Sequence, residues 1–230
     1  MRVQQPNRMG EWRDRWQARY RDGPWLFGRE PSAWLASLDS VLPRQGRALS
    51  LGEGEGRNAV WLARRGLSVT AVDFAPTALA RAASLAAEAC VRLTLIEADV
   101  TRWRPPAASF DLVLLIFLQL SADERVPAHR AACEALAPGG LLVLEAFARG
   151  PWRDCGPKSD EARYDAATLE RDFRDLDIIE LSSGRAVLGE GEGHRGEASV
   201  VRLIARRPTL DGEGRAPTSG AWTRTAPSPP

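Results

Sequence analysis

The stretch Arg47-Ala-Leu-Ser-Leu-Gly-Glu-Gly-Glu-Gly-Arg-Asn-Ala-Val-Trp-Leu-Ala-Arg-Arg-Gly-Leu-Ser-Val-Thr-Ala-Val-Asp73 decides the fold of this chain. Residues 48–51 form a short apolar run that is typical of a buried strand, and three glycines follow at alternate positions. Asn58 is expected to cap a helix that ends near Gly66. A second apolar run, residues 68–72, then ends at Asp73. This order of strand, glycine turn, helix, strand and acid predicts a nucleotide-binding βαβ unit.

The charges of the glycine turn indicate which ligand the unit binds. A dinucleotide-binding turn has a third glycine where this chain has Arg57. The turn also holds Glu53 and Glu55, whose carboxylates would repel a pyrophosphate at the start of the helix. They suit a cationic ligand without phosphate, such as S-adenosylmethionine (SAM), which has a sulfonium and an ammonium. Asp73 is placed to accept hydrogen bonds from the ribose hydroxyls.

The segments 51–58 and 69–73 resemble the first two motifs of class I SAM-dependent methyltransferases, and the form Gly-Glu-Gly-Arg-Asn is similar to the tellurite-resistance and thiopurine-type branch. The resemblance covers roughly residues 12–207. Ser50 stands where the family has an acid for the methionine ammonium, so Glu53 is expected to take that role. Asp99 matches the residue that binds the adenine amine, although a turn aspartate that caps backbone is the alternative. The expected cofactor-binding residues are Trp16, Gly52, Glu53, Gly54, Gly56, Asn58, Asp73, Phe74, Asp99 and Val100.

Composition sets the class of the protein more broadly. With 230 residues and a net charge of +1, the chain fits one α/β domain and offers no global field for nucleic acid. It has no run of 18 apolar residues and no signal-peptide core, so no membrane association is expected. Its three cysteines have no pair spacing, which is typical of a reducing compartment and predicts a cytoplasmic protein. No metal site is expected, and a monomer or a homodimer fits equally.

The two ends of the chain lie outside the βαβ pattern. Residues 1–10 are expected to be flexible, and residues 208–230, rich in Pro, Gly, Ser and Thr, to be disordered. Residues 11–207 form the predicted methyltransferase domain. Trp12, Trp16 and Tyr20 recur on one face of a helix that begins at Glu11. The helix is expected to act as a lid, with Trp16 against the cofactor as the resemblance implies. The alternative is a helix that packs its aromatics on the domain.

The rest of the pattern completes the fold. Strands are expected near residues 91–96, 110–118 and 141–147, with helices between them and a turn at residues 137–140. Two strands without an intervening helix follow, at residues 176–188 and 198–206. The expected fold is a Rossmann-like α/β domain with a mostly parallel seven-stranded sheet whose last strand is antiparallel. A long loop at residues 150–164 is either a binding loop or an exposed connection.

Two residues are candidates for the chemistry. His194 lies in the glycine-rich connection of the last two strands, whose tip should face the cofactor, and Glu145 lies near the end of the fifth strand. Either could act as a general base for a hydroxyl or amine acceptor. The alternative for His194 is a solvated loop histidine. His129 is expected to be a surface or hydrogen-bonded helical residue.

The predicted reaction is methyl transfer from SAM to a small molecule or to a soft sulfur, selenium or tellurium nucleophile, which needs no base. The strand that ends Leu115-Ile-Phe-Leu118 lacks the Asn/Asp-Pro-Pro-aromatic motif of amino-directed nucleic-acid methyltransferases, so no nucleic-acid substrate is expected. The alternatives are a non-catalytic SAM-binding protein and an NAD-dependent oxidoreductase. Within the turn, Glu53 is expected to face the cofactor and Glu55 to point to solvent.

Overall fold

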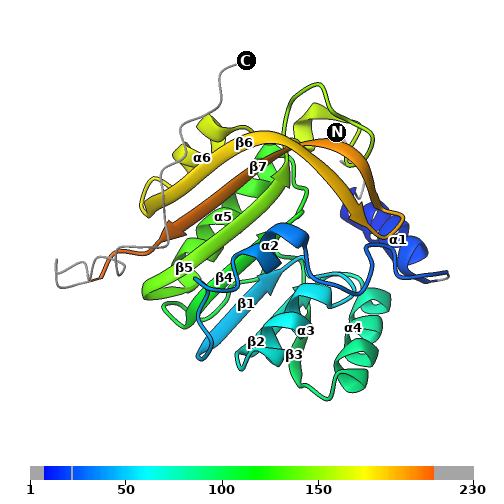
Figure 1. Ribbon diagram of the computed structural model, residues 1–230, viewed down its shortest axis with the longest axis horizontal. Coiled ribbons are helices and arrows are strands. Elements are labelled where there is room, and N and C mark those ends of the chain that lie inside the picture. The colour runs from blue at the N-terminus through cyan, green and yellow to red at the C-terminus, as the bar shows by residue number, and fades with distance from the viewer. Residues whose placement is uncertain (1–7, 22, 210–230) are drawn as a thin grey trace, which may run out of the picture.

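The computed structural model describes residues 8–21 and 23–209, and Figure 1 shows their arrangement. The helices are α1 (Arg8–Arg21), α2 (Ala33–Ser37), α3 (Arg57–Arg64), α4 (Pro76–Glu88), α5 (Ala122–Ala135), the short 3₁₀ turn η1 (Asp160–Ala162) and α6 (Ala166–Asp172). The strands are β1 (Arg47–Leu51), β2 (Ser68–Asp73), β3 (Leu93–Glu97), β4 (Phe110–Ile116), β5 (Leu136–Phe147), β6 (Asp177–Glu190) and β7 (His194–Arg206).

The seven strands form one sheet in the order β3-β2-β1-β4-β5-β7-β6. All neighbouring pairs up to β5 are parallel, whereas β7 is antiparallel to both β5 and β6. The predicted Rossmann-like sheet with an antiparallel last strand is therefore confirmed. Because strand directions agree from β1 to β5, the carboxyl ends of these strands meet at one edge, where ligands bind in folds of this kind.

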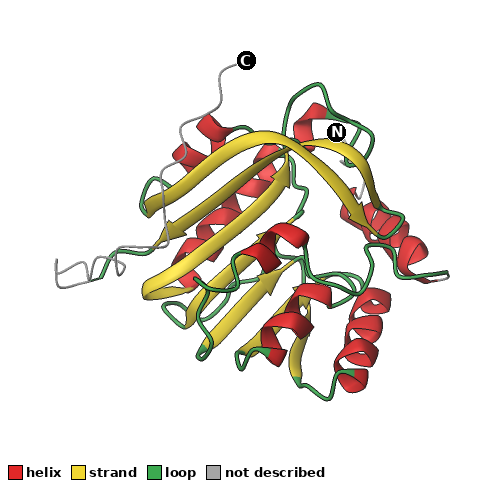
Figure 2. Cartoon of the chain, in the orientation of Figure 1, coloured by secondary structure: helices red, strands yellow, loops and turns green. Residues whose placement is uncertain are grey.

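Helices cover both faces of the sheet, as Figure 2 shows. On one face, alternate strand residues such as Leu49 and Val113 pack with α5, α6 and Phe173 in one apolar cluster. On the other face, Leu112 and Leu114 pack against α2 and α3. The central strands are buried on both sides, which explains why β4 is an almost continuous apolar run.

The β6–β7 hairpin extends beyond the rest of the sheet. Phe147, the last residue of β5, pairs with Val200 of β7, so residues 194–199 of β7 have β6 as their only partner strand. In Figure 1 this two-stranded ribbon arches over the carboxyl edge and comes down beside α1. The glycine-rich connection between the two predicted strands is reduced to residues 191–193, because both strands continue to Glu190 and His194.

Two further element boundaries differ from the sequence predictions. The first helix begins at Arg8 rather than Glu11. The predicted turn at residues 137–140 is part of β5, where Phe110 pairs with Leu136 and Leu112 with Leu141, so these four residues form a bulge. Most of the predicted flexible N-terminus and of the predicted disordered tail lies outside the described residues.

A buried charge cluster joins α5 to α6. The Asp172 carboxylate lies 2.9 Å from Nε of Arg125 and 3.1 Å from Nδ1 of His129, and the His129 ring stacks on Phe173 at 4.6 Å. His129 is therefore a buried, hydrogen-bonded helical residue. Burial would raise the pKa of Asp172, but the bonds from His129 and Arg125 outweigh it and hold that pKa at about 2.

We expect Asp172→Asn to lower the free energy of unfolding by about 3 kcal/mol, because it leaves Arg125 buried without its counter-ion. The depressed pKa means that the wild-type contribution is present above the ordinary aspartate pKa and is lost as the pH falls toward 2. Urea unfolding at pH 7 measures the effect. Asp175→Asn, whose side chain is 85% exposed, is the matched control. Equal losses in the two variants would contradict this account.

Candidate active site

The glycine turn follows β1 at the carboxyl edge. Gly52, Gly54 and Gly56 have φ angles of +66°, +66° and +93°, a conformation that side chains with a Cβ rarely adopt. A Cβ on Gly56 would lie 2.7 Å from the Cβ of Ala82, so this glycine also allows α3 and α4 to pack closely. A Cβ on Gly54 would lie 3.1 Å from the hydroxyl of Tyr20. The spacing of the glycines thus reflects both backbone conformation and close neighbours.

Glu53 turns inward and caps α3. Its Oε1 accepts hydrogen bonds from the backbone N–H groups of Asn58 at 3.0 Å and Ala59 at 2.9 Å, and its Oε2 accepts one from the hydroxyl of Ser50. Burial raises the pKa of Glu53 to about 6. The prediction that Asn58 caps this helix is therefore wrong. The N-cap residue is Gly56, and the Asn58 side chain accepts from the backbone N–H of Ser32 at 2.9 Å.

Glu55 does not point to solvent, so that prediction is also wrong. The residue is 3% exposed. Its Oε2 accepts from the backbone N–H groups of Leu26 at 2.8 Å and Phe27 at 3.4 Å, and its Oε1 lies 2.9 Å from Nη1 of Arg81. The carboxylate therefore anchors the segment Leu26–Gly28 to the glycine turn. The local alternation of the turn did not reveal this, because the partner is 29 residues earlier in the chain.

Asp73 ends β2 directly beside the turn. Its two carboxylate oxygens accept from the backbone N–H groups of Gly54 at 2.8 Å and Ala75 at 2.9 Å, and burial raises its pKa. Among the ion pairs of the described residues, none involves Asp73 or Glu53. Two buried carboxylates without a cationic side chain fit a ligand that brings positive charge. These two carboxylates are compatible with SAM.

Helix α1 lies over the glycine turn. The Trp16 ring stacks on Tyr20 at 5.5 Å, and both contact Phe27. The carbonyl oxygen of Tyr20 accepts from Arg81 of α4 at 3.0 Å. Trp12 is 41% exposed, so it does not share the packed aromatic face that the sequence predicted. The packed part of α1 therefore covers the turn with Tyr20, and Trp16 packs on the Tyr20 ring.

The remaining predicted cofactor residues lie on the next two strand ends. Oδ1 of Asp99 accepts from the backbone N–H of Thr101 at 2.9 Å and from its hydroxyl at 2.7 Å, which is the backbone-capping alternative. Val100 is buried and Phe74 is half-buried. The adenine contact of Asp99 stays a prediction.

The tip of the β6–β7 hairpin docks on the segment Leu26–Gly28. The backbone N–H of Gly193 donates to the carbonyl oxygen of Leu26 at 2.7 Å. Gly191 has a φ of +67°, and a Cβ there would lie 2.5 Å from the backbone nitrogen of Gly28. Gly191 is thus needed for the close approach of the two backbones. The hairpin tip, the Leu26–Gly28 segment and the glycine turn form one contiguous layer.

The structure places His194 at the start of β7, in an aromatic enclosure. Its ring lies 4.4 Å from the rings of Phe27 and Phe117 and 5.4 Å from that of Phe147. Nδ1 lies 3.3 Å from Oε2 of Glu190. Burial lowers the pKa of His194, although Glu190 acts in the opposite direction. His194 is therefore a buried, oriented imidazole and not the solvated loop histidine of the alternative.

Glu190 was not predicted from the sequence as a residue of the site. Its Oε2 lies 2.8 Å from Nη2 of Arg57, and its Oε1 accepts from the backbone N–H of Ala33 at 2.9 Å. Burial would raise its pKa, but the bond from His194 and the charge of Arg57 hold that pKa at about 2. The sequence did hold a signal for this pair, because an acid and a histidine flank Gly-Glu-Gly. A tight hairpin makes two such residues direct cross-strand neighbours.

Glu145, the second predicted base, is held by other residues. Its Oε2 accepts from the hydroxyl of Ser32 at 2.7 Å, and its Oε1 accepts from Nε of Arg202 at 2.9 Å. Burial raises its pKa, and Arg202 lowers it. Arg202 is also its direct cross-strand neighbour on β7. Both oxygens are thus committed to the protein, and of the two predicted bases the geometry favours His194.

A second residue missed from the sequence is Gln119, just after β4. Both polar atoms of its side-chain amide are buried and lack a hydrogen-bond partner among the described residues. Phe117 nearby has a φ of +54°, an uncommon conformation for a residue with a Cβ. The hydroxyl of Tyr164 donates to the carbonyl oxygen of Leu118 at 2.9 Å and accepts from the backbone N–H of Leu120 at 3.2 Å. The Tyr164 hydroxyl therefore holds the backbone on both sides of Gln119, whose side-chain amide is buried.

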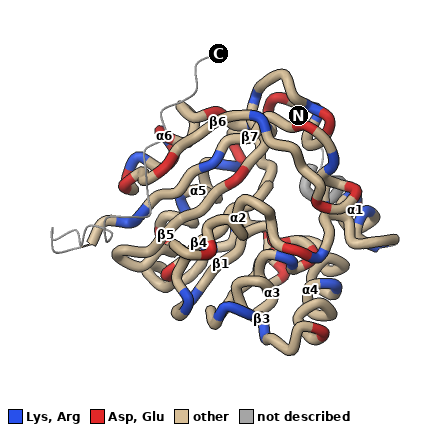
Figure 3. Tube along the Cα trace, in the orientation of Figure 1, with Lys and Arg blue, Asp and Glu red and all other residues tan. Residues whose placement is uncertain are grey.

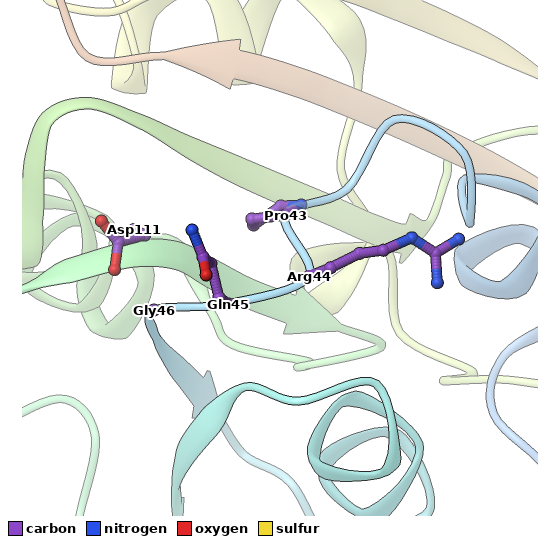
Figure 4. A pocket seen from close by; sticks show the side chains of 5 residues that line it. All are labelled: Pro43, Arg44, Gln45, Gly46 and Asp111. Atoms are coloured by element: carbon purple, nitrogen blue, oxygen red, sulfur yellow. The ribbon is translucent and has the colours of Figure 1, made fainter.

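Figure 4 shows a pocket that lies elsewhere, lined by Pro43, Arg44, Gln45, Gly46 and Asp111. Gly46 precedes β1 and Asp111 is near the start of β4, so this pocket is at the amino edge of the sheet, opposite the glycine turn. The described residues contain no group of three or more His, Cys, Asp or Glu side chains that could hold a metal ion. In that same part of the chain, no helix is long and apolar enough to span a membrane.

Comparison with known proteins supports the same class. Residues 48–140 match the family described as a methyltransferase domain. Thiocyanate methyltransferase 1 of Brassica oleracea is 29% identical over 134 residues, which cover 56% of this chain and 59% of that protein. The 2-heptyl-1-hydroxyquinolin-4(1H)-one methyltransferase of Mycobacteroides abscessus is 28% identical over 127 residues, covering 54% and 56%. The crystal structure of TehB from Haemophilus influenzae superposes with a TM-score of 0.60 at 17% identity, covering 75% of this chain and 60% of that one.

Residues 48–140 therefore match a methyltransferase domain, and the sheet has the Rossmann-like fold of class I SAM-dependent methyltransferases, as predicted from the glycine turn and Asp73. TehB has the same fold. SAM is the cofactor that this family and fold imply. The matches span little more than half the length of the curated relatives, so the activity of the whole protein belongs to the proposal below.

We expect Gly191→Ala to lower the free energy of unfolding by about 1–3 kcal/mol, because it adds backbone strain and a contact that one of the two segments must relieve. Gly189→Ala is the matched control in the same hairpin, since a Cβ there meets nothing within 4 Å. Thermal or urea unfolding of the two variants provides the comparison. If Gly191→Ala is as stable as Gly189→Ala, the hairpin tip is not docked as described.

Proposed function

We propose that this protein is a SAM-dependent methyltransferase that moves a methyl group to a small-molecule acceptor or to a soft nucleophile. One observation carries the proposal. The glycine turn, two buried carboxylates without cationic partners and an oriented histidine all lie at the carboxyl edge of the sheet. Arg57 is committed to Glu190 and fills the position of the third glycine of a dinucleotide site, which speaks against NAD.

The curated relatives support a small acceptor. One is named for thiocyanate, a sulfur-containing anion, and the other for a hydroxyquinolone. Helix α1, the Leu26–Gly28 segment and the hairpin tip lie over the glycine turn, as described above. An acceptor that must pass these elements is more easily a small molecule than a flipped nucleic-acid base. Figure 3 shows acidic and basic residues along the chain between α3 and the end of the hairpin.

The residues of the site would act chiefly by position and charge. SAM would supply an electrophilic methyl group on a sulfonium. Asp73 would accept from the ribose hydroxyls, and the backbone of Gly52–Gly56 would support the methionine part. The buried acids would favour the positive charge, and the packed aromatic residues would exclude water. No oxyanion develops in methyl transfer, which agrees with a site that offers carboxylates rather than an oxyanion hole.

Isothermal titration with SAM, S-adenosylhomocysteine and NAD tests the proposal. We expect saturable binding of SAM and S-adenosylhomocysteine and none of NAD. Binding of NAD alone would favour the oxidoreductase alternative. Turnover is then tested by mass spectrometry of acceptor panels incubated with SAM. Tight SAM binding without methylation of any acceptor class would favour the non-catalytic alternative.

We expect Asp73→Ala to weaken SAM binding at least about tenfold, because ribose hydroxyls left unpaired in a closed site cost about 1–3 kcal/mol. The matched control is Asp111→Ala. Asp111 is also a strand aspartate that accepts a backbone N–H, from Arg47 at 2.8 Å, but at the opposite edge of the sheet. Calorimetry on both variants, after thermal unfolding has shown that they fold, decides the assignment. An unchanged dissociation constant for Asp73→Ala would reject it.

A further inference from the structure

Glu190 and His194 form a hydrogen-bonded dyad at the end of the hairpin. Oε2 of Glu190 lies 3.3 Å from Nδ1 of His194 across the end of the hairpin. A carboxylate accepts only, so the hydrogen bond places the proton of the neutral imidazole on Nδ1. The lone pair is then on Nε2, which makes no hydrogen bond among the described residues. The dyad therefore fixes the tautomer of the imidazole and leaves Nε2 as its basic nitrogen.

The surrounding charges keep the dyad in this state. Three charged groups from three elements act on His194: Glu190 from β6, Arg57 from α3 and Arg19 from α1. The nearby charge of Arg57 keeps Glu190 ionised. Burial, Arg57 and Arg19 all disfavour a protonated His194. A neutral imidazole beside an ionised carboxylate is the resting form that a general base needs.

The side-chain contact between Glu190 and His194 is not needed to hold the two strands of the hairpin together. Glu190 and His194 are already joined by the backbone pairing of β6 and β7, and the tip is held on Leu26 by the Gly193 amide. The aromatic rings around His194 have no need of an imidazole for packing. The ion pair with Arg57 accounts for the acid and the arginine, but it does not account for an imidazole held by the same carboxylate.

We propose that Glu190 is a positioning residue that fixes His194 as the general base, and that the methyl acceptor therefore carries an ionisable hydroxyl, thiol or N–H. This inference rests on the proposed function and narrows its substrate class. As the acceptor atom forms its bond to the methyl carbon, the sulfonium–carbon bond breaks and its electron pair returns to sulfur. The acceptor proton passes to Nε2 of His194, and the imidazolium later releases it to solvent. An acceptor that is already an anion would need none of this.

The direct test is ¹⁵N NMR of the imidazole nitrogens in the whole protein without substrate. The chain has two histidines, so His129 serves as an internal reference. We expect His194 to be protonated on Nδ1 and not on Nε2. In Glu190→Gln we expect a mixture of tautomers at His194, with the His129 signals unchanged as proof of folding. A wild-type His194 protonated on Nε2 would overturn the role of Glu190, even if the variant failed to fold.

A kinetic test addresses the acceptor class with phenol and an alkanethiol, 2-mercaptoethanol, as proton-bearing probes and thiocyanate as a proton-free anion. We expect His194→Gln and Glu190→Gln to lower kcat for the proton-bearing probes roughly a hundredfold with little change in KM, and to spare thiocyanate. For the wild type, we expect kcat/KM to rise with pH, and the midpoint of this rising limb to lie below the ordinary histidine pKa. In Glu190→Gln this limb should move to lower pH, because the carboxylate raises the pKa of His194.

The outcomes separate this inference from the proposed function. Equal losses on thiocyanate and on phenol would show that the dyad is not a base. A wild type that binds SAM but methylates thiocyanate and neither proton-bearing probe would overturn the acceptor class. A chain that binds no SAM would contradict the proposed function, whereas the tautomer of His194 decides the positioning role of Glu190 independently.

Discussion

The buried ion pair between Arg57 and Glu190 is the constraint on which the site depends. Arg57 is the first residue of α3, directly after the glycine turn, and Glu190 is the last residue of β6. Their side chains are 7% and 11% exposed and lie 2.8 Å apart. The pair ties the cofactor half of the sheet to a hairpin that extends beyond its other half. Because one charge without the other would be buried and uncompensated, the pair strongly favours one position of the hairpin end.

Two further contacts make the same connection through the Leu26–Gly28 segment. Glu55 holds the amides of this segment from the glycine turn, and the amide of Gly193 holds its Leu26 carbonyl from the hairpin. The turn, the segment and the hairpin tip therefore share their polar contacts, and a change in one is expected to disturb the others. This places the proposed cofactor site and the proposed base in a single rigid layer, which suits a reaction that depends on alignment.

The sequence predicted the sheet well because its signals are local. The apolar runs, the glycine turn and Asp73 each depend on neighbours within a few residues. The site was predicted less completely, because its contacts cross the fold. Glu55 was expected in solvent but binds amides of the distant Leu26 segment. Asn58 was expected to cap α3, but Glu53 takes its place. Glu190 was missed, because its pairing with His194 depends on how tight the hairpin is, and its pairing with Arg57 joins residues far apart in the chain.

A double-mutant cycle on Arg57 and Glu190 tests the central claim most directly. The free energy of unfolding of the wild type, Arg57→Met, Glu190→Gln and the double variant would be measured by urea unfolding at pH 7. Both substitutions keep the approximate side-chain volume, so the cycle reports mainly the charge pair. We expect a coupling free energy of about 1–3 kcal/mol, with the double variant more stable than the sum of the single losses allows. Additive losses, within about 0.3 kcal/mol, would show that the two halves of the site are not joined by this pair.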